Sequence, residues 1–509
     1  MTRFFVSLFV FTVIVCSSFA QDAVQREKER DLRLPPDDTH YRVAQPYVEE
    51  KIDSDYVHAS PEAYEAFRDI KYSVRIHWGV YAMWNLEASW PWISSGMSNE
   101  KKQAYQNLYK EFNPTEFDAD EWMEFFKRCG MQAFAFTSKH TDGFSMFHTK
   151  TRVKQRVNYL QPQEKMIEQC DLSYSIEESP FKRDIVKELC DAGHKHGIKI
   201  DLYYPNPDWY DADFRPFSHH PLTTERSKAN KDNEFGTYNT KSGFPYIMSP
   251  EPTKEEHDRM MTRYREQLRE LLTNYGKIDM VCLDEWLGKD VWQQHKETVK
   301  MMRQLQPDVM IRNRGIGNYG DYYQPEQVVP GGKKNSNMPW MSICLLGKIF
   351  AYDPKAENYK GAGWVIHNLI DCVAKGGSFM VCIGPDAKGK FHPTAVKQLE
   401  EVGDWLKVNG QGIYETRSRE VWKENRKEGN IKFTRSKDNK TVYAFVEKFP
   451  EKELAIESVN VKDGSEVRLL GYDKVLQWHK ADKGIVITIP DGLQRPCNYA
   501  WAFRLEQAD

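Results

Sequence analysis

The sequence predicts an α/β protein in which a (β/α)8-like barrel over residues 56–413 is followed by an antiparallel β-sandwich over residues 414–509. Short apolar runs alternate with longer helical patterns between residues 72 and 408, the order of parallel strands joined by helices. Beyond residue 414, short alternating runs separated by Asp-Gly and Asp-Asn turns indicate antiparallel strands. Because the loops after the barrel strands are long and no glycine-rich dinucleotide motif follows the first strand, a barrel is favoured over an open doubly wound sheet.

The individual elements follow from apolar runs and helix signals. Ser179 and Pro180 are typical of a helix start, and Gly197 is typical of a helix stop. The expected barrel strands cover 72–76, 132–136, 198–204, 278–284, 308–311, 340–346 and 379–383. The expected barrel helices cover 118–128, 179–196, 253–274, 292–305, 359–374 and 393–408. The expected sandwich strands cover 431–434, 441–446, 453–456, 466–470, 484–489 and 499–505.

The N-terminus has the pattern of a secretory signal peptide over residues 1–20. Arg3 precedes the apolar stretch 4–15, and Ala20 ends a small-residue cleavage site. The apolar stretch is too short for a membrane span. We therefore expect an exported protein without a membrane span, whose polar leader over residues 21–55 precedes the barrel.

Composition limits the partners. The net charge of −3 gives no reason to expect nucleic acid as a ligand. The cysteines show neither a disulfide framework nor a zinc spacing, and the histidines and carboxylates are spread over several strands without a metal-ligand spacing. We expect no metal and no cofactor. The sequence does not predict an oligomeric state.

Asp284 is the strongest candidate for a catalytic residue. It ends the apolar run 278–283, where packing gives no reason for an acid. In a parallel barrel, such an acid lies at the mouth where chemistry takes place. Other expected strands also end in polar or aromatic residues, namely His77, Trp78, His140, Thr141, Tyr204, Asp208, Trp209, Glu285, Trp286, Arg312 and Arg314. Five strand ends of this kind together predict an active site.

Five motifs resemble glycoside hydrolase family 29, the α-L-fucosidases, over residues 62–414. They are His77-Trp78-Gly79, the run from Lys139 to Phe144, Leu202-Tyr203-Tyr204 followed by Asp208-Trp209, Leu283-Asp284, and Ala374-Lys375-Gly376-Gly377 followed by Ile383-Gly384-Pro385. The resemblance implies retaining hydrolysis with an aspartate nucleophile, at the position of Asp284, and a glutamate acid/base. It also implies that His77 and His140 hold sugar hydroxyls, that Arg314 keeps Asp284 ionised, and that the remaining pocket residues include Trp78, Thr141, Tyr204, Trp209 and Trp286.

Three departures from the family pattern matter. Cys382 stands where the family has an asparagine before Ile-Gly-Pro. Thr141 stands where the family commonly has a second histidine, and Met341 stands where many members have the acid/base glutamate. A thioether cannot transfer a proton. Glu326, on the expected loop after the fifth strand, is the candidate replacement, and Asp321 shares that loop. Inversion, with Asp284 as the base, is the other possibility.

Two functions are therefore open. One is an exo-acting hydrolase that removes terminal α-L-fucosyl or closely related α-L-galactosyl residues from glycans. An α-L-galactoside differs only by an added hydroxyl, which a pocket rejects weakly. The alternative is a catalytically impaired carbohydrate-binding protein on the same scaffold.

Overall fold

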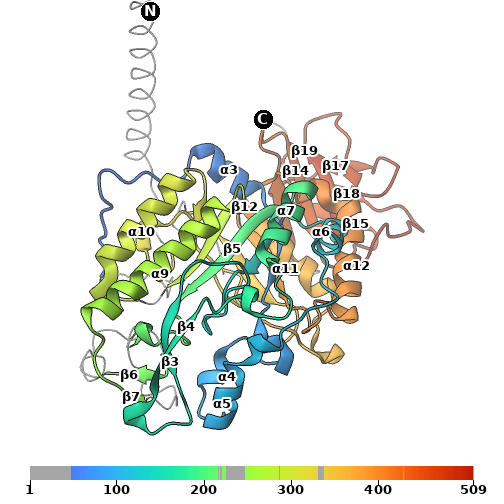
Figure 1. Cartoon of the computed structure of the whole chain (residues 1–509). Helices are drawn as coiled ribbons and strands as arrows, with labels where there is room; N and C mark the ends of the chain where they lie inside the picture. The colour runs from blue at the N-terminus through green and yellow to red at the C-terminus, as the bar shows by residue number, and fades with distance from the viewer. Residues whose placement is uncertain are drawn as a thin grey trace, which may run out of the picture.

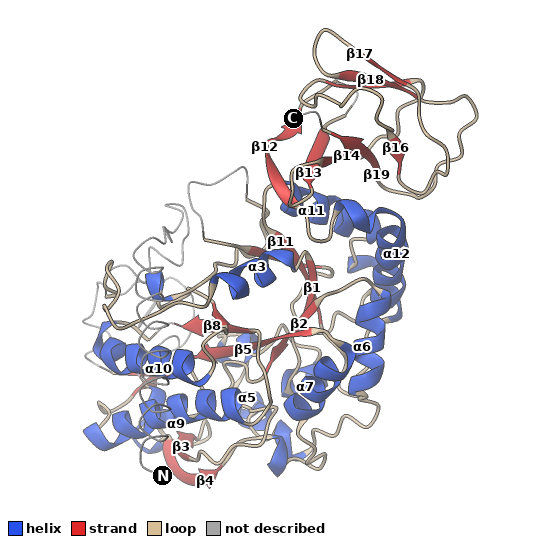
Figure 2. Cartoon of the chain, turned by 90° about the horizontal axis from the view of Figure 1, so that it is seen from above, coloured by secondary structure: helices blue, strands red, loops and turns tan. Residues whose placement is uncertain are grey.

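The computed structural model describes residues 47–507 except 216, 218–219, 225–246, 286, 331–337 and 428. Seven parallel strands form the main sheet, in the order β10-β11-β1-β2-β5-β8-β9. Their bounds are Tyr72–Ile76 (β1), Ala133–Thr137 (β2), Lys199–Asn206 (β5), Met280–Glu285 (β8), Met310–Ile311 (β9), Met341–Leu345 (β10) and Ser378–Ile383 (β11). Seen from above, the strands curl around a common centre inside a layer of helices (Figure 2).

The segment 321–327 joins the two edges of this sheet. On one side Tyr322 forms a parallel bridge with Arg312, next to the end of β9, and on the other Glu326 forms a parallel bridge with Ile343 of β10. The N–H of Ile343 also donates to this segment at 2.9 Å. The segment takes the place of an irregular eighth strand, sixth in chain order, and the predicted (β/α)8-like barrel is confirmed.

Helices surround the barrel (Figures 1 and 2). The longer helices are Pro61–Asp69 (α3), Ala119–Arg128 (α6), Ile185–His196 (α7), Lys254–Thr273 (α9), Trp292–Leu305 (α10), Ala362–Ala374 (α11) and Pro393–Asn409 (α12). The loop after β1 contains the short helices Trp90–Ile93 (α4) and Asn99–Tyr105 (α5). The loops after β2 and β5 contain two small strand pairs, Val153–Val157 (β3) with Ile167–Leu172 (β4) and Leu222–Thr223 (β6) with Ile247–Met248 (β7). Among the residues described, no helix combines the length and apolarity needed to cross a membrane.

The predicted start of α7 is wrong. The sequence pattern places it at Ser179-Pro180, whereas the helix begins at Ile185. Asp184 is the N-cap, and its carboxylate accepts the N–H of Lys187 at 2.9 Å. Asp and Ser are both good caps, but Asp184 lies directly before the apolar run, whereas the hydroxyl of Ser179 donates back to the carbonyl of Ile176. The predicted end is confirmed, because Gly197 has a φ of 70° in the left-handed region.

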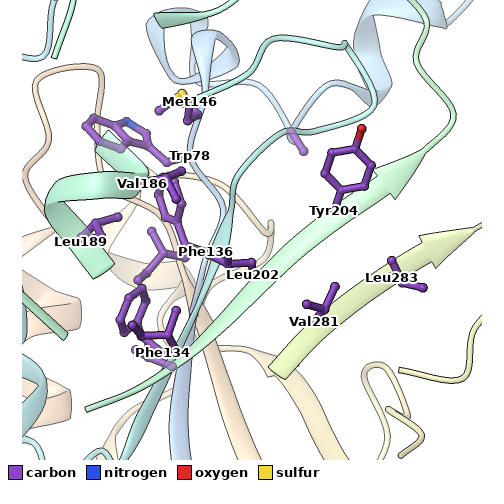
Figure 3. Close-up of a cluster of buried hydrophobic side chains, with 14 of the residues drawn as sticks. Trp78, Phe134, Phe136, Met146, Val186, Leu189, Leu202, Tyr204, Val281 and Leu283 are labelled. Atoms are coloured by element: carbon purple, nitrogen blue, oxygen red, sulfur yellow. The ribbon is translucent and has the colours of Figure 1, made fainter. Parts of the chain in front are cut away.

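Side chains on the barrel strands alternate between the helix layer and the barrel interior. Phe134, Leu202 and Leu283 belong to the hydrophobic cluster between the strands and the helices, which also contains Trp78 and Leu189 (Figure 3). The amino end of the interior is apolar and contains four methionines, which share a buried cluster with side chains of α3: Met280, Met310, Met341, Met380, Tyr64 and Phe67. Above them lies a polar layer that contains Arg75, Asp201, Cys282, Arg312 and Gln324. The candidate site lies above that layer, at the carboxyl end of the strands.

The C-terminal part is a two-sheet antiparallel structure, as predicted. One sheet contains Arg417–Glu424 (β12), Ile431–Arg435 (β13), Thr441–Val446 (β14), Trp501–Glu506 (β19) and Arg468–Leu469 (β16). The other contains Glu453–Ile456 (β15), Ile485–Thr488 (β18) and Trp478–Lys480 (β17). The sheets enclose their own hydrophobic core. The sequence analysis missed β12 and β17, because their residues are mostly polar and partly or fully exposed. Residues 1–46, which include the expected signal peptide and most of the leader, lie outside the described residues.

Replacing Gly403 of α12 with alanine should destabilise the protein. In most helices this change is favourable by about 1 kcal/mol. Here the new Cβ would overlap the backbone carbonyl of Arg128 at the end of α6. We expect the free energy of unfolding to fall by about 1–3 kcal/mol, the usual cost of overpacking, as measured by urea denaturation.

Gly363 of α11 is the matched control. A Cβ there meets only the half-exposed ring of Tyr499, which can turn away. Gly363→Ala should leave stability unchanged or raise it slightly. Equal losses in both variants would contradict the proposed close approach of α6 and α12.

Candidate active site

Four strands supply the residues at the centre of the site. His77, Asp284, Arg314 and Glu326 each stand two residues beyond a polar residue of the layer below, at the end of a strand or shortly after it. Those lower residues are Arg75, Cys282, Arg312 and Gln324, respectively. A spacing of two keeps side chains on one face of a strand. The strands therefore bring side chains far apart in sequence to one mouth, at the end where parallel barrels carry their active sites.

Asp284 is held at both carboxylate oxygens. Oδ1 accepts Nη1 of Arg314 at 2.5 Å, and Oδ2 accepts the hydroxyl of Tyr203 at 2.7 Å. Burial raises the pKa of Asp284, but the charges of Arg314 and Arg312 outweigh burial and hold the pKa well below its usual range. The carboxylate is thus ionised and fixed in orientation.

Glu326 is joined to Asp284 through a single guanidinium. Nη2 of Arg314 donates to Oε1 of Glu326 at 2.6 Å, while Nη1 of the same group holds Asp284. Arg312 adds a second donor to Oε1 at 3.0 Å. Since the two nitrogens belong to one small planar group, the two carboxyl groups lie close together. The side chain of Glu326 is 32% exposed and that of Asp284 is 16% exposed, so Glu326 is nearer to solvent.

Two histidines line the opposite wall. The rings of His77 and His140 lie 5.6 Å apart, and the ring of Tyr203 stacks on His140 at 5.8 Å. Nδ1 of His140 contacts the hydroxyl of Ser89, which is also 2.5 Å from the hydroxyl of Thr141. Burial lowers the pKa of His140 to about 4, and burial together with the charge on its neighbours lowers the pKa of His77 well below its usual value. Both imidazoles are therefore neutral at neutral pH.

The structure places Tyr203, rather than Tyr204, against Asp284. Tyr204 faces the helix layer (Figure 3), where its hydroxyl donates to Gln267 at 2.6 Å and accepts from Lys139 at 3.1 Å. Burial, followed by the charge of Asp284, raises the pKa of Tyr203 well above its usual value, so the hydroxyl remains a donor. The period of two on β5 could have identified Tyr203, because it faces the same way as Asp201.

The predicted tryptophans lie in different surroundings. Trp78 is fully buried, packs on Trp122, and donates to the backbone oxygen of Asp386 at 2.9 Å. Trp209 lies at the site. Its backbone N–H donates to the carbonyl of Thr141 at 2.8 Å, and its ring lies 5.0 Å from that of Trp90. Trp286 lies outside the described residues.

A buried charge network supports the loops that carry His140 and Trp209. Asp208 accepts from Arg263 and Lys139 and from the backbone N–H of Asp211. Burial raises the pKa of Asp208, but the two cations outweigh it and lower the pKa to about 2. Gly143 has a φ of 82°, and a Cβ there would overlap the Asp208 carboxylate. Glycine is therefore required at position 143, because any side chain there would be strained and would clash with Asp208.

Comparison with known proteins identifies the family. The model of the α-L-fucosidase family matches residues 40–411, and the model of the α-L-fucosidase C-terminal domain matches residues 423–506. The chain belongs to glycoside hydrolase family 29, the α-L-fucosidases.

Its relatives within the family are distant. It is 25% identical to human plasma α-L-fucosidase, over 86% of this chain and 89% of that one, and 23% identical to an α-L-fucosidase of Dictyostelium discoideum, over 84% and 86%. The structure resembles α-L-fucosidase isoenzyme 1 from Paenibacillus thiaminolyticus, with a TM-score of 0.70, 24% identity, and coverage of 88% of this chain and 99% of that chain. It also resembles a trapped covalent intermediate of a Bacteroides thetaiotaomicron family 29 α-L-fucosidase with 2-fluoro-fucosyl fluoride (TM-score 0.67, 20% identity, coverage 90% and 98%).

The position of Met341 resolves one apparent departure from the α-L-fucosidase pattern. Met341 is the first residue of β10, is fully buried, and contacts the hydroxyl of Ser73 at 3.4 Å. It belongs to the apolar layer at the amino end of the barrel, away from Asp284 at the carboxyl end. A glutamate at this position would not reach the mouth, so Met341 does not bear on acid catalysis.

Sequence reasoning missed a second carboxylate at the rim. Glu87 accepts the N–H of Phe350 at 3.0 Å, and the ring of Phe350 lies 4.9 Å from that of His77. Burial raises the pKa of Glu87. Neither residue lies in a motif or at a strand end, so the sequence offered no signal for them. Within the described part of the chain, no cluster of three or more His, Cys, Asp or Glu side chains has the arrangement of a metal site.

Replacing Arg314 with methionine should shift the pH dependence. Burial of Asp284 would remain while its main counter-charge is lost, so its pKa would rise. We expect the acidic limb of kcat/KM for an aryl α-L-fucoside to move to higher pH, and its maximum to fall by at least about 100-fold, on the scale of a broken buried ion pair.

Arg152→Met is the control, because Arg152 forms an exposed ion pair with Asp171. Its pH profile should match that of the unmodified protein. An unchanged acidic limb in Arg314→Met would refute the assigned role of Arg314.

Proposed function

We propose that the protein is an exo-acting glycoside hydrolase that removes terminal α-L-fucosyl or closely related α-L-galactosyl residues from glycans. Asp284 is the nucleophile and Glu326 is the acid/base. The observation that carries this proposal is the guanidinium of Arg314, which bonds Asp284 at 2.5 Å and Glu326 at 2.6 Å.

The first step uses the ionised state of Asp284. Its carboxylate attacks the anomeric carbon, the bond from that carbon to the leaving oxygen breaks, and Glu326 donates a proton to the leaving oxygen. In the second step Glu326 takes a proton from water, whose oxygen displaces Asp284 from the anomeric carbon. The greater exposure of Glu326 suits it to meet both the leaving group and the water.

A short separation between the carboxyl groups supports retention. Retaining enzymes have such groups about 5–5.5 Å apart, whereas inverting enzymes need a wider gap for water. Two hydrogen bonds to one guanidinium favour the shorter gap. The covalent intermediate trapped in a structurally similar bacterial enzyme is consistent with this chemistry.

Neutral imidazoles suit the binding of sugar hydroxyls. His140 is anchored through Nδ1, and Nδ1 of His77 lies 3.5 Å from the thiol of Cys382, so we assign Nε2 of each ring to the sugar. A neutral imidazole can donate or accept there. We further propose that the protein is exported, on the strength of the signal-peptide pattern in residues 1–20.

Hydrolysis of aryl α-L-fucosides and aryl α-L-galactosides tests the activity and its preferred sugar. Asp284→Asn should abolish turnover with either substrate while thermal unfolding stays cooperative, because the nucleophile is lost but the shape is kept. Near-normal turnover in this variant would refute the assignment. Proton NMR of the first-formed sugar should show the α-anomer if the reaction retains configuration.

Glu326→Gln tests the acid/base. With a poor leaving group, turnover should fall by about 10²–10⁴-fold, the usual contribution of general acid catalysis. With a strongly activated aryl leaving group, the rate of the first step should fall much less. Glu87→Gln is the matched control, because Glu87 is the other carboxylate at this rim. If Glu87→Gln shows this dependence on leaving group and Glu326→Gln does not, the assignment is wrong.

The same hydrolysis experiment also tests the alternative, a catalytically impaired carbohydrate-binding protein. No cleavage of either aryl sugar, together with measurable binding of L-fucose, would favour it. The location of Met341 removes the observation that motivated this alternative.

A further inference from the structure

One thiol lies at the centre of the polar layer beneath the site. Cys282 stands two residues before Asp284 on β8 and faces the barrel interior. Nη2 of Arg75 donates to its sulfur at 2.7 Å, and Nη1 of Arg312 donates to it at 3.4 Å. Cys282 and Arg312 are fully buried, and Arg75 is 1% exposed. One arginine comes from β1, which is separated from β8 by β2 and β5, and the other comes from the end of β9, which pairs with β8, so the sulfur links three strands.

Each of these arginines leads to one of the two carboxylates. Arg312 uses its other terminal nitrogen, Nη2, to hold Glu326 at 3.0 Å. Arg75 lies over the ring of Tyr203 at 5.1 Å, and the hydroxyl of Tyr203 holds Asp284 at 2.7 Å. The sulfur therefore contacts two arginines. One of them bonds Glu326, and the other packs on the tyrosine that bonds Asp284.

Both arginines need the sulfur as a hydrogen-bond acceptor, because they are buried and cannot donate to water. A buried donor without an acceptor is costly, and a guanidinium that loses one partner turns toward another. Asp201 contributes charge near both arginines, but its carboxylate accepts no hydrogen bond from either guanidinium. The thiol of Cys282 also donates to Gln324 at 3.6 Å, and the backbone oxygen of Gln324 accepts from Arg312 at 3.3 Å. Cys282 thus contacts Arg312 directly and also holds the side chain of Gln324, whose backbone contacts Arg312.

We propose that Cys282 is a positioning residue for the hydrolytic reaction. Its sulfur holds Arg312 and Arg75 in the orientation that sets Glu326 and Asp284 relative to one another. This inference rests on the proposed function of those two carboxylates. The thiol touches neither the substrate nor the reacting atoms, and it acts only through the two guanidinium groups.

Cys282→Ala is the main test. It removes the acceptor shared by both arginines, so Arg312 should move away from Glu326. We expect kcat for a substrate with a poor leaving group to fall by at least 10-fold, with little change in KM and a smaller loss for an activated aryl substrate. The alkaline limb of kcat/KM should move to higher pH, because a cation further from the acid favours loss of its proton less. Cys282→Ser, whose hydroxyl can accept from both arginines, should restore part of kcat and of the pH profile.

Cys190→Ala is the control, because Cys190 is a buried thiol in the apolar layer between α7 and the barrel. It should keep the kinetics of the unmodified protein, although both alanine variants lose a buried side chain. Equal kinetics in Cys282→Ala and Cys190→Ala would overturn the proposal. If Cys282→Ala does not fold, Cys282→Val takes its place as a variant of similar size without an acceptor. A larger loss of kcat and a larger shift of the alkaline limb in Cys282→Val than in Cys282→Ser support the proposal, and equal kinetics in the two variants overturn it.

A crystal structure of the folded variant separates this inference from the proposed function. If the unmodified protein hydrolyses neither aryl sugar, the proposed function fails. The structure of the variant still reports whether Arg312 has left Glu326. An Arg312 to Glu326 contact that stays at its original distance without the sulfur would overturn the positioning role.

Discussion

The guanidinium of Arg314 is the group on which the rest of the site depends. Its two terminal nitrogens hold the two carboxyl groups, that of Asp284 at 2.5 Å and that of Glu326 at 2.6 Å. Its positive charge also keeps the nucleophile Asp284 ionised. Arg312 adds a second positive charge behind the pair, and Tyr203 fixes the remaining oxygen of Asp284. The same few contacts therefore fix the positions of the two carboxyl groups and supply the positive charge around them.

The irregular sixth strand explains how Glu326 reaches this position. Pro325 has no N–H to donate, so the segment cannot form a continuous ladder with its neighbours. It nevertheless bridges to Arg312 on one side and to Ile343 on the other. The bridge at Glu326 comes directly after the proline and directs that side chain into the mouth. The sequence places Glu326 in a loop, whereas the fold places it in a bridge with β10.

The sequence predicts the barrel well because its strands and helices differ in period and length. Asp284, Arg314, His77 and His140 are found for the same reason, since each follows a strong apolar run. Other features depend on contacts that no local pattern records. Tyr203 and Tyr204 are neighbours of one residue type, and only the orientation of β5 decides which of them faces Asp284. Met341 shows the converse error: a motif alignment places it at the site, while its position at the start of β10 puts it at the opposite end of the barrel. Glu87 and Ser89 come from a loop with no regular pattern, so only the folded chain brings them to the histidines.

The polar layer inside the barrel also has a consequence for folding. Counting the site and the layer below it, Arg75, Arg312 and Arg314 lie near Asp201, Asp284 and Glu326, and these six ionisable side chains come from five separate segments of the barrel wall. A partial barrel without β8 would take Cys282 from Arg75 and Asp284 from Arg314, and one without the sixth segment would take Glu326 from Arg312 and Arg314. Each would leave buried guanidinium groups with fewer acceptors. Uncompensated buried charge is far more costly than lost apolar contact. Partly assembled barrels are therefore penalised by electrostatics, and closure of the ring and assembly of the catalytic centre become one cooperative event.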